Sequence, residues 1–331
     1  MKAIALTTPG SPDVLQLQDW PTPQIQTPTE VVVRLKAAGV NPIDTKLRQR
    51  GTFYPDHMPA ILGLDGAGIV AAIGTQVTDV RVGDEVYFCN GGLGEHPGTY
   101  AEFATVDQRF LALKPASLSF VAAAAVPLVV ITAWEALYDR VQLQAGQRVL
   151  IQAGAGGVGH VAIQLARLKG ARVCTTVSSD QKAAFVQPLG AELAINYREQ
   201  NVIEAVLDWT HGEGVDIAFD TLGGPILSQC FAAVRDYGDV VTLLEPAPDT
   251  DWKTARTRNL RTSFELMLTP LLKKLTTAQQ HQADILKQTA QLIDAGQFTI
   301  HVSKTFPLGA AADAHRFLAA GSVTGKVVLV I

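Results

Sequence analysis

The stretch Val149-Leu150-Ile151-Gln152-Ala153-Gly154-Ala155-Gly156-Gly157-Val158-Gly159 decides the fold of this chain. An apolar strand, residues 148–151, runs directly into a glycine-rich turn, and residues 160–169 then read as a helix that Gly170 ends. A strand, a G-x-G-x-x-G turn and a helix in this order are typical of a dinucleotide-binding unit. We therefore predict that the turn holds a pyrophosphate, with contacts from Gly154, Ala155, Gly156, Gly157, Val158 and Gly159.

The glycines of this turn are each predicted to have a structural role. Gly154 permits a tight turn, Gly156 and Gly157 let the backbone approach the pyrophosphate, and Gly159 lets the helix press against its strand. The helix N-terminus then offers free N–H groups and the positive end of the helix dipole to the phosphates. The turn therefore predicts dinucleotide binding through backbone groups.

The end of the second strand, residues 171–177, indicates which dinucleotide is bound. An Asp or Glu there would accept hydrogen bonds from the adenosine ribose and select NAD, but this chain has Ser178. Asp180 comes later and is expected to be the N-cap of the helix that carries Lys182. A small hydroxyl side chain leaves room for a 2′-phosphate, and Lys182 offers a positive charge. We therefore predict NADP, and NADPH as its reduced form.

A second basic position, Arg198 beside Tyr197, follows a third strand at residues 193–196. We predict that Tyr197 borders the same adenosine site. The alternative interpretation is that Lys182 and Arg198 are ordinary solvated charges.

Composition places the chain among intracellular enzymes. It has 331 residues, 47% of them apolar, and a net charge of -4, which predicts two domains and gives no reason to expect nucleic acid or an anionic membrane as a partner. Its three cysteines are far apart in sequence, which favours a reducing, cytoplasmic location. The longest uncharged apolar run, Val121–Trp134, contains Pro127 and is too short for a membrane span, so we expect a buried helix.

The chain divides into three blocks. Residues 1 to about 120 read as strands and turns, among them 30–36, 68–73 and 82–87, which suits a partly open β-barrel. The middle block alternates apolar strands with helices, which predicts a parallel sheet covered on both faces. Its strands are expected at 148–151, 171–177, 193–196, 215–219 and 240–244. The last block has helices at 277–295 and 309–319 and strands at 299–303 and 326–331.

These blocks predict an α/β protein in which a dinucleotide-binding domain is inserted into another domain. The expected bounds are residues 125–262 for the inserted domain and residues 1–124 with 263–331 for the other. A basic segment, residues 251–261, lacks the interleaved aromatic residues of a nucleic-acid site, so we expect a solvated loop or helix.

The whole chain resembles the medium-chain dehydrogenase/reductase superfamily, and within it the zinc-free quinone oxidoreductases related to zeta-crystallin. The resemblance rests on the segments Gly39-Val40-Asn41-Pro42-Ile43-Asp44, Leu62-Gly63-Leu64-Asp65-Gly66-Ala67-Gly68, Val82-Gly83-Asp84-Glu85-Val86, Ala153 to Gly159, Ile195-Asn196-Tyr197-Arg198-Glu199 and Thr324-Gly325-Lys326-Val327-Val328-Leu329. It implies a Rossmann-type doubly wound parallel sheet inserted in a partly open β-barrel, the GroES-like catalytic domain, and a homodimer that pairs the last strands of two nucleotide sheets. In this chain that strand is expected at 240–244.

The departures from the zinc-dependent branch of the superfamily are informative. Where zinc alcohol dehydrogenases have a Cys ligand this chain has Asn41, and where they have a His-Glu pair it has Leu64-Asp65. The four-cysteine structural zinc loop is missing as well, and Cys89 stands alone. Since these side chains cannot replace the ligands of a catalytic zinc, we predict no metal.

The resemblance also implies which residues line the site. Asn41 is expected to donate to the substrate oxygen or the nicotinamide amide, Tyr54 to wall the cleft and Thr132 to lie near the nicotinamide, while Asp44 is either a site residue or only a turn cap. Lys326 either reaches the cofactor or is an exposed charge at a strand end. The other cofactor contacts expected by matching are Leu222, Gly223, Leu243, Leu244 and Phe264.

Three functions are compatible with these expectations. The first is reduction of quinones by NADPH without zinc, and the second is NADPH-dependent reduction of the C=C bond of α,β-unsaturated aldehydes or ketones. The third is NADPH binding with little catalysis. A conjugated acceptor suits a metal-free site, because conjugation spreads the charge that develops when hydride arrives.

Overall fold

The computed structural model describes all residues, Met1–Ile331, and divides them into two compact units. Unit 1 comprises Met1–Leu128 and Leu268–Ile331, and unit 2 comprises Val129–Met267. The chain passes between them within α3 (Pro127–Trp134) and again after Met267. The insertion of one domain into the other is thus observed, with divisions at 128/129 and 267/268 where the sequence predicted 124/125 and 262/263.

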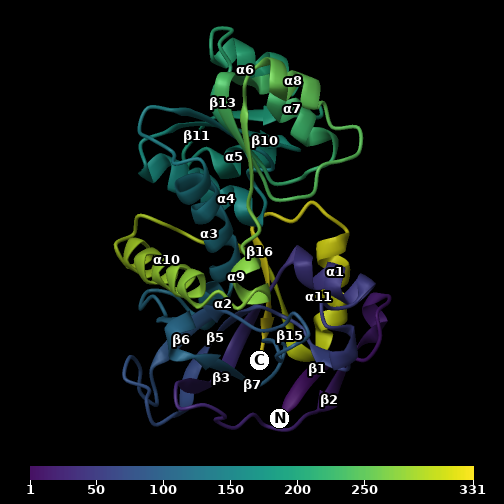
Figure 1. Cartoon of the computed structure of the whole chain (residues 1–331), viewed down its shortest axis with the longest axis vertical. Coiled ribbons are helices and arrows are strands. Elements are labelled where there is room, and N and C mark those ends of the chain that lie inside the picture. The colour runs from purple at the N-terminus through teal and green to yellow at the C-terminus, as the bar shows by residue number, and fades with distance from the viewer. The chain divides into compact units, whose positions relative to one another are not determined.

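Unit 2 is built on one parallel sheet of six strands in the order β11-β10-β9-β12-β13-β14 (Figure 1). The strands are β9 (Arg148–Ile151), β10 (Arg172–Val177), β11 (Ala191–Asn196), β12 (Val215–Asp220), β13 (Val234–Thr242) and β14 (Arg261–Phe264). The strands β9, β10 and β11 follow one another toward one edge of the sheet, and β12, β13 and β14 follow one another toward the opposite edge. The order therefore reverses between β9 and β12, which confirms the doubly wound Rossmann-type fold.

Helices cover this sheet: η4 (a π-helix, Glu135–Arg140), α4 (Gly157–Leu168), α5 (Asp180–Val186), α6 (Val202–Trp209), α7 (Pro225–Ala233) and α8 (Trp252–Thr257). Val149, Leu150 and Ile151 of the central strand β9 are fully buried, as expected of a strand that is covered on both faces. One core of fully buried side chains joins Leu150, Ile195 and Ala218 of three strands to Val206 of α6 and Phe231 of α7. The helix predicted at residues 160–169 begins three residues earlier, at Gly157.

Unit 1 contains a three-stranded sheet, β2-β1-β4, and a seven-stranded one, β15-β16-β3-β5-β6-β8 with β7 paired to β3. Their strands are β1 (Lys2–Leu6), β2 (Leu15–Asp19), β3 (Glu30–Val40), β4 (Ala60–Ile61), β5 (Asp65–Ile73), β6 (Glu85–Cys89), β7 (Phe103–Asp107), β8 (Leu111–Leu113), β15 (Val302–Pro307) and β16 (Lys326–Val330). β16 joins the first block antiparallel to β3, with Val328 opposite Gly39. The last block therefore folds back on the first, as predicted.

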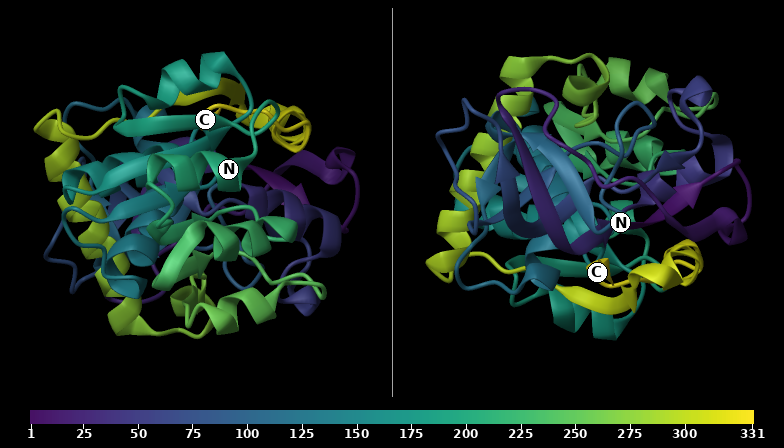
Figure 2. Two further views of the ribbon diagram at one scale, coloured as in Figure 1. Left: turned by 90° about the horizontal axis from the view of Figure 1, so that it is seen from above. Right: turned by 90° about the horizontal axis from the view of Figure 1, so that it is seen from below.

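The helical elements of unit 1 are η1 (Pro12–Val14), α1 (Pro42–Arg50), η2 (Pro55–His57), η3 (Gln108–Phe110), α2 (Phe120–Ala124), α9 (Thr269–Leu272), α10 (Thr276–Asp294), η5 (Leu308–Ala310) and α11 (Ala311–Ala319). The long helix α10 lies alongside β8 and η3, where Asp294 accepts hydrogen bonds from the backbone of Ala116 and Ser117. Both termini of the chain belong to this unit and lie near each other in all three views (Figures 1 and 2).

Two predictions about elements were wrong. The apolar run Val121–Trp134 forms two helices, α2 and α3, because Pro127 lacks an N–H and starts a new helix. The strand predicted at 240–244 begins at Val234 and ends at Thr242, and it is not the edge of its sheet, because β14 pairs parallel to it. The exposed edge on that side belongs to β14.

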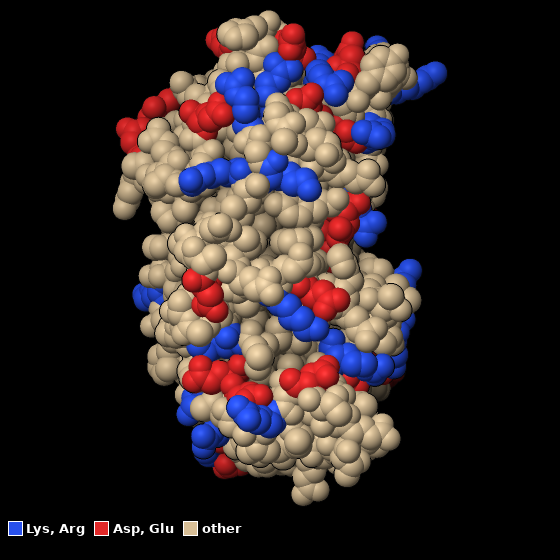
Figure 3. Space-filling view, turned by 90° about the vertical axis from the view of Figure 1, so that its left-hand side faces the viewer, with Lys and Arg blue, Asp and Glu red and all other residues tan.

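The surface carries charges of both signs. On the face shown in Figure 3, Lys and Arg side chains are interspersed with Asp and Glu. Within the basic segment, residues 252–257 form α8, Arg261 pairs with Asp239, and Arg258 donates to the Val234 carbonyl. No helix is long and apolar enough to cross a membrane. The three cysteines are unpaired, and the cytoplasmic location stays a prediction.

Candidate active site

The glycine-rich turn is held by β10. The Ala153 N–H donates to Thr176 Oγ1 at 2.9 Å, and the Gly154 N–H donates to the Thr176 carbonyl at 3.0 Å. The left-handed residue of the turn is Ala153, with φ 52°, rather than Gly154. Gly154 is required for a different reason, since a Cβ there would lie 2.1 Å from Thr175 Oγ1. The prediction that Gly154 provides the tight turn is therefore corrected: it provides close packing against β10.

The next glycines shape the start of α4. Gly156 is the N-cap residue, with extended backbone, and a Cβ there would meet only the Ala153 carbonyl oxygen, at 3.1 Å. At Gly159 a Cβ would lie 2.2 Å from that oxygen, so only glycine lets the helix approach the turn this closely. The first N–H groups of an α-helix lack partners within it and attract anions. The turn therefore fits a pyrophosphate at the N-terminus of α4.

The other predicted cofactor residues of unit 2 gather at one edge of its sheet. Because all six strands are parallel, the residues that follow them share the carboxyl edge, where ligands bind at the point at which strand order reverses. The residues that follow β10 to β14 there include Ser178, Tyr197, Leu222, Leu243 and Leu244, with Phe264 at the end of β14. Thr132 is elsewhere in unit 2, buried on α3.

One end of this edge lies between β10 and β11, where the sequence predicted the adenosine site. Val177 is opposite Asn196 in the ladder, so Ser178 and Tyr197 follow adjacent strands. The N-cap of α5 is Ser179, whose hydroxyl accepts from the Lys182 N–H, and not Asp180 as predicted. Lys182 is half-buried, and its ammonium makes no ion pair with a carboxylate. These positions therefore combine a hydroxyl, an aromatic ring and an uncompensated positive charge.

The other end of the edge is organised by Asp220, the last residue of β12. Its Oδ1 accepts from the N–H groups of Leu222 and Gly223, both at 2.9 Å, and its Oδ2 accepts from Thr242 Oγ1. Gly223 has φ +68°, and a Cβ there would lie 2.7 Å from that of Leu244. The bulky Leu244, predicted as a cofactor contact, therefore packs directly against the turn that holds Gly223.

In unit 1, Asn41 is the centre of a buried cluster. Its side-chain Nδ2 donates to Asp65 Oδ2 at 2.9 Å, and its Oδ1 accepts from the Lys326 ammonium. Lys326 also lies 3.4 Å from Asp65 Oδ2, and it is only 3% exposed. The interpretation of Lys326 as an exposed strand-end charge is thus wrong. Both ends of the Asn41 amide are engaged, which leaves one N–H for any further partner.

Asp44 has the capping role that the sequence left open. Asn41 and Asp44 form a capping box at the start of α1, in which Asp44 Oδ2 accepts from the Asn41 backbone N–H at 2.8 Å. The carboxyl group is fully buried and also accepts from the Tyr100 hydroxyl at 2.9 Å, whereas its Oδ1 has no partner. Burial raises the pKa of Asp44 to about 7, against these hydrogen bonds, which lower it.

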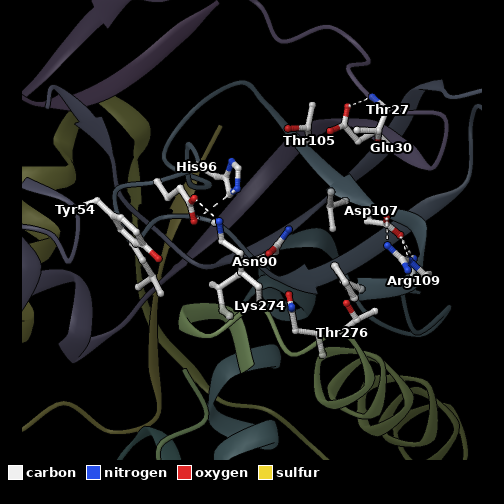
Figure 4. Close-up of a pocket in the computed structure, with 17 residues that line it drawn as sticks. Thr27, Glu30, Tyr54, Asn90, His96, Thr105, Asp107, Arg109, Lys274 and Thr276 are labelled. Atoms are coloured by element: carbon white, nitrogen blue, oxygen red, sulfur yellow. Dashed lines mark hydrogen bonds and ion pairs between the residues drawn. The ribbon is translucent and has the colours of Figure 1, made fainter. Parts of the chain in front are cut away.

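Tyr54 is not part of the Asn41 cluster. It is the N-cap of η2, stacks on His57 and lines a cavity of about 320 Å³ within unit 1. Figure 4 shows Tyr54 at one side of this cavity and Arg109 at the other, with Lys274 between them. The Lys274 ammonium pairs with Glu95 at 2.6 Å. Arg109 likewise pairs with Asp107, so the cavity joins a phenol, two closed ion pairs and apolar side chains.

Comparisons with known proteins agree with this geometry. An alcohol dehydrogenase GroES-like domain model matches residues 27–116, and a zinc-binding dehydrogenase model matches residues 189–329. A quinone oxidoreductase of Pseudomonas aeruginosa is 33% identical over 99% of both chains. An NADPH-dependent alkenal/one oxidoreductase of Arabidopsis thaliana chloroplasts is 32% identical over 99% of this chain and 79% of its own. The Escherichia coli quinone oxidoreductase complexed with NADPH superposes with a TM-score of 0.88, at 28% identity and full coverage of both chains.

The chain belongs to the quinone oxidoreductase branch of the medium-chain dehydrogenase/reductase superfamily. It is accordingly an oxidoreductase, and the predicted fold of a Rossmann-type domain within a GroES-like one is confirmed.

The residues of this oxidoreductase do not fit a zinc ion, although one matching family model describes zinc-binding dehydrogenases. No three His, Cys, Asp or Glu side chains are placed to hold a metal. At the positions of the family's ligands, Asn41 engages Lys326, and Asp65 binds Asn41 and the Leu128 N–H at the start of α3. A buried ammonium group thus accompanies Asp65, and a second cation beside it would be repelled.

Sequence reasoning did not identify Asp65, which binds Asn41, or Tyr100, which binds Asp44 and also contacts His315. Asp65 had a usable signal, because a carboxylate inside the apolar run Leu62–Gly68 must be buried with a partner. Tyr100 and His315 had none, since they meet through a contact between residues 215 positions apart.

Proposed function

We propose that this oxidoreductase transfers hydride from NADPH to quinones without a metal ion. The observation that carries the proposal is the carboxyl edge of the unit 2 sheet, with a pyrophosphate turn beside Ser178 and the unpaired Lys182. The Arabidopsis relative favours a second candidate, NADPH-dependent reduction of alkenals and alkenones. NADPH binding with little catalysis is the third possibility, and turnover distinguishes it from both.

Bound NADPH would supply the hydride. Gly156 to Gly159 would hold its pyrophosphate, Ser178, Lys182 and Tyr197 its phosphorylated ribose, and the turn Leu222–Gly223 with Leu243 and Leu244 its nicotinamide half. Thr132, Phe264 and Lys326 also remain proposed cofactor contacts. Lys326 donates a hydrogen bond to Asn41, so it would contact the cofactor as a member of the Asn41 cluster. In unit 1, Tyr54 would donate a hydrogen bond to the acceptor from the cavity that it lines, and Asn41 and Asp44 would serve the acceptor from their separate cluster.

The reaction is tested by NADPH oxidation with a 1,4-quinone, with an enal and with no acceptor. We expect turnover with a conjugated acceptor, no measurable oxidation of simple alcohols, and no loss after prolonged chelation. Tyr54→Phe should lower kcat/KM by about 1–3 kcal/mol, the usual cost of losing a hydrogen bond in a desolvated site. Tyr237→Phe, whose ring is 69% exposed, is the control. Saturated alcohols oxidised faster than quinones or enones are reduced would overturn the assignment.

Cofactor choice is expected to depend on Ser178. Titration by fluorescence should show that NADPH binds at least about tenfold more tightly than NADH, or about 1.4 kcal/mol. Ser178→Asp should reverse this preference, because a carboxylate repels the 2′-phosphate and accepts from an unmodified ribose. Ser178→Asn is the control, because the Asn side chain has nearly the same shape as Asp but carries no charge. This variant should still prefer NADPH. Equal affinities for both cofactors in the unmodified protein would contradict the prediction.

We also propose a homodimer, now built on β14 rather than β13. The edge of β14 presents unpaired backbone groups, and Phe264 on it is 54% exposed, a combination that proteins usually cover. Light scattering should give twice the 35.3 kDa chain mass at micromolar concentration. The Glu265 N–H bonds the Thr242 carbonyl, so by alternation Thr262 directs its N–H outward, and Thr262→Pro should yield monomers. A monomeric unmodified protein would refute the proposal.

A further inference from the structure

Three buried side chains from separate parts of unit 1 form one hydrogen-bonded chain. Asp44 lies on α1, Tyr100 precedes β7 and His315 lies on α11. The Tyr100 hydroxyl is 2.9 Å from Asp44 Oδ2 and 3.2 Å from His315 Nε2, and all three residues are inaccessible to solvent. A carboxyl, a hydroxyl and an imidazole group can each both give and take a proton. The connection is therefore a continuous path for protons.

The ends of this chain are unsatisfied. Four buried side-chain atoms lack a hydrogen-bond partner: Asp44 Oδ1, His315 Nδ1, Arg48 Nε and Thr99 Oγ1. The first two are the terminal atoms of the chain, and Thr99 is next to Tyr100. Buried polar groups without partners are rare and destabilising. The two ends of this one chain are therefore among the few buried polar atoms that still have a hydrogen bond to make.

We propose that Asp44, Tyr100 and His315 form a relay that supplies the proton consumed when a conjugated acceptor is reduced. The inference rests on the proposed function. It adds Tyr100 and His315, which act through Asp44, to the residues that serve the reaction.

Reduction of a quinone to a hydroquinone takes one hydride, which carries the electron pair from NADPH, and one proton. The O–H bond at Asp44 Oδ1 breaks and an O–H bond forms on the acceptor oxygen. Asp44 Oδ2 then takes the Tyr100 proton, and Tyr100 takes the proton of His315 Nε2. His315 accepts a proton at Nδ1 as Nε2 gives one up, and because this atom is buried, a water molecule must enter during turnover to deliver it. No relay group is oxidised or reduced.

The charges around the relay suit these tasks. The negative charge of Asp65 on β5 opposes ionisation of Asp44. The Lys326 ammonium on β16, the Asn41 N–H and the Tyr100 hydroxyl favour it. The other titratable group nearby is the thiol of Cys89, which burial keeps uncharged. With a pKa of about 7, Asp44 can hold and release a proton at neutral pH. Burial and the nearby Arg48 lower the pKa of His315 to about 3, so His315 passes protons on as a neutral ring.

Tyr100→Phe is the decisive variant, because it removes the link and leaves both ends in place. Tyr87→Phe is its matched control: Tyr87 is equally buried in unit 1 and donates to the Leu286 carbonyl, outside the relay. The measurements are single-turnover NADPH oxidation with a quinone across pH, in H₂O and D₂O, and infrared titration of protonated carboxyl bands. Asp44→Asn identifies the Asp44 band.

We expect a carboxyl band that titrates near pH 7 and is absent in Asp44→Asn. The unmodified rate should fall above that pH, and Tyr100→Phe should slow single turnover at least about tenfold, since general acids commonly contribute 100-fold or more. Its solvent isotope effect should change, while Tyr87→Phe keeps the original profile. The relay is refuted if Tyr100→Phe also keeps that profile and isotope effect. Absence of any quinone or enone turnover would instead refute the proposed function, and the infrared titration would still test Asp44.

Discussion

Gly159→Ala should destabilise the oxidoreductase by about 3 kcal/mol and abolish NADPH binding. The added Cβ would lie 2.2 Å from the Ala153 carbonyl oxygen and 2.7 Å from Gly154 Cα, which are backbone atoms that cannot move aside singly. α4 would have to shift away from the turn, and such overpacking costs about 1–3 kcal/mol or more. The better helix propensity of Ala returns only about 1 kcal/mol. Urea unfolding and NADPH titration measure the two effects.

Gly156→Ala is the comparison that separates folding from binding. Its Cβ would meet one oxygen at 3.1 Å, and the backbone there is ordinary extended conformation, so the free energy of unfolding should change by less than about 1 kcal/mol. NADPH affinity should still fall, because the new methyl group stands where the pyrophosphate is expected to approach. Equal stability losses in both variants would contradict the geometry of the turn.

The fold could be predicted because its signals are local. The first strand of the sheet of unit 2, residues 148–151, was predicted with the bounds that the structure shows, since three consecutive apolar residues before a glycine-rich turn leave few alternatives. The short strand β14, Arg261–Phe264, was missed because its sequence, Arg-Thr-Ser-Phe, has a single apolar residue and no alternating pattern. It becomes a strand through pairing with β13, which sequence patterns do not reveal.

The site could be predicted only where its residues are close in sequence. The Asn41–Asp44 pair is a capping box at a spacing of three residues, which a sequence can show. The bonds of Asn41 to Asp65 and Lys326 bridge 24 and 285 positions, and nothing local specifies them. Only the long-range contacts of unit 1, which motif matching does not reveal, show which candidate residues are buried together.

The pH dependence of stability should reveal two opposing groups in this buried chain. Asp44 has a folded pKa of about 7 against an ordinary value of 3.8, so the folded protein binds the extra proton and stability falls as pH rises from about 4 to 7. His315 has a folded pKa of about 3 against 6.5, so the unfolded chain binds the extra proton and stability falls as pH drops below about 6.5. Between about pH 4 and 6.5 the two slopes cancel.

A variant that lacks one of these two groups should therefore show the pH dependence of stability that the other group causes. Over this range each contribution amounts to roughly 3–4 kcal/mol, at about 1.4 kcal/mol per pH unit. Relative to the unmodified protein, Asp44→Asn should gain stability steadily from pH 4 to 7, and His315→Gln should lose it steadily from pH 4 to 6.5. Urea unfolding at a series of pH values measures both differences. Tyr87→Phe should differ from the unmodified protein by the same amount at every pH, because burial raises the pKa of Tyr87 far above this range. Parallel curves for all three variants would show that Asp44 and His315 do not titrate as their burial requires.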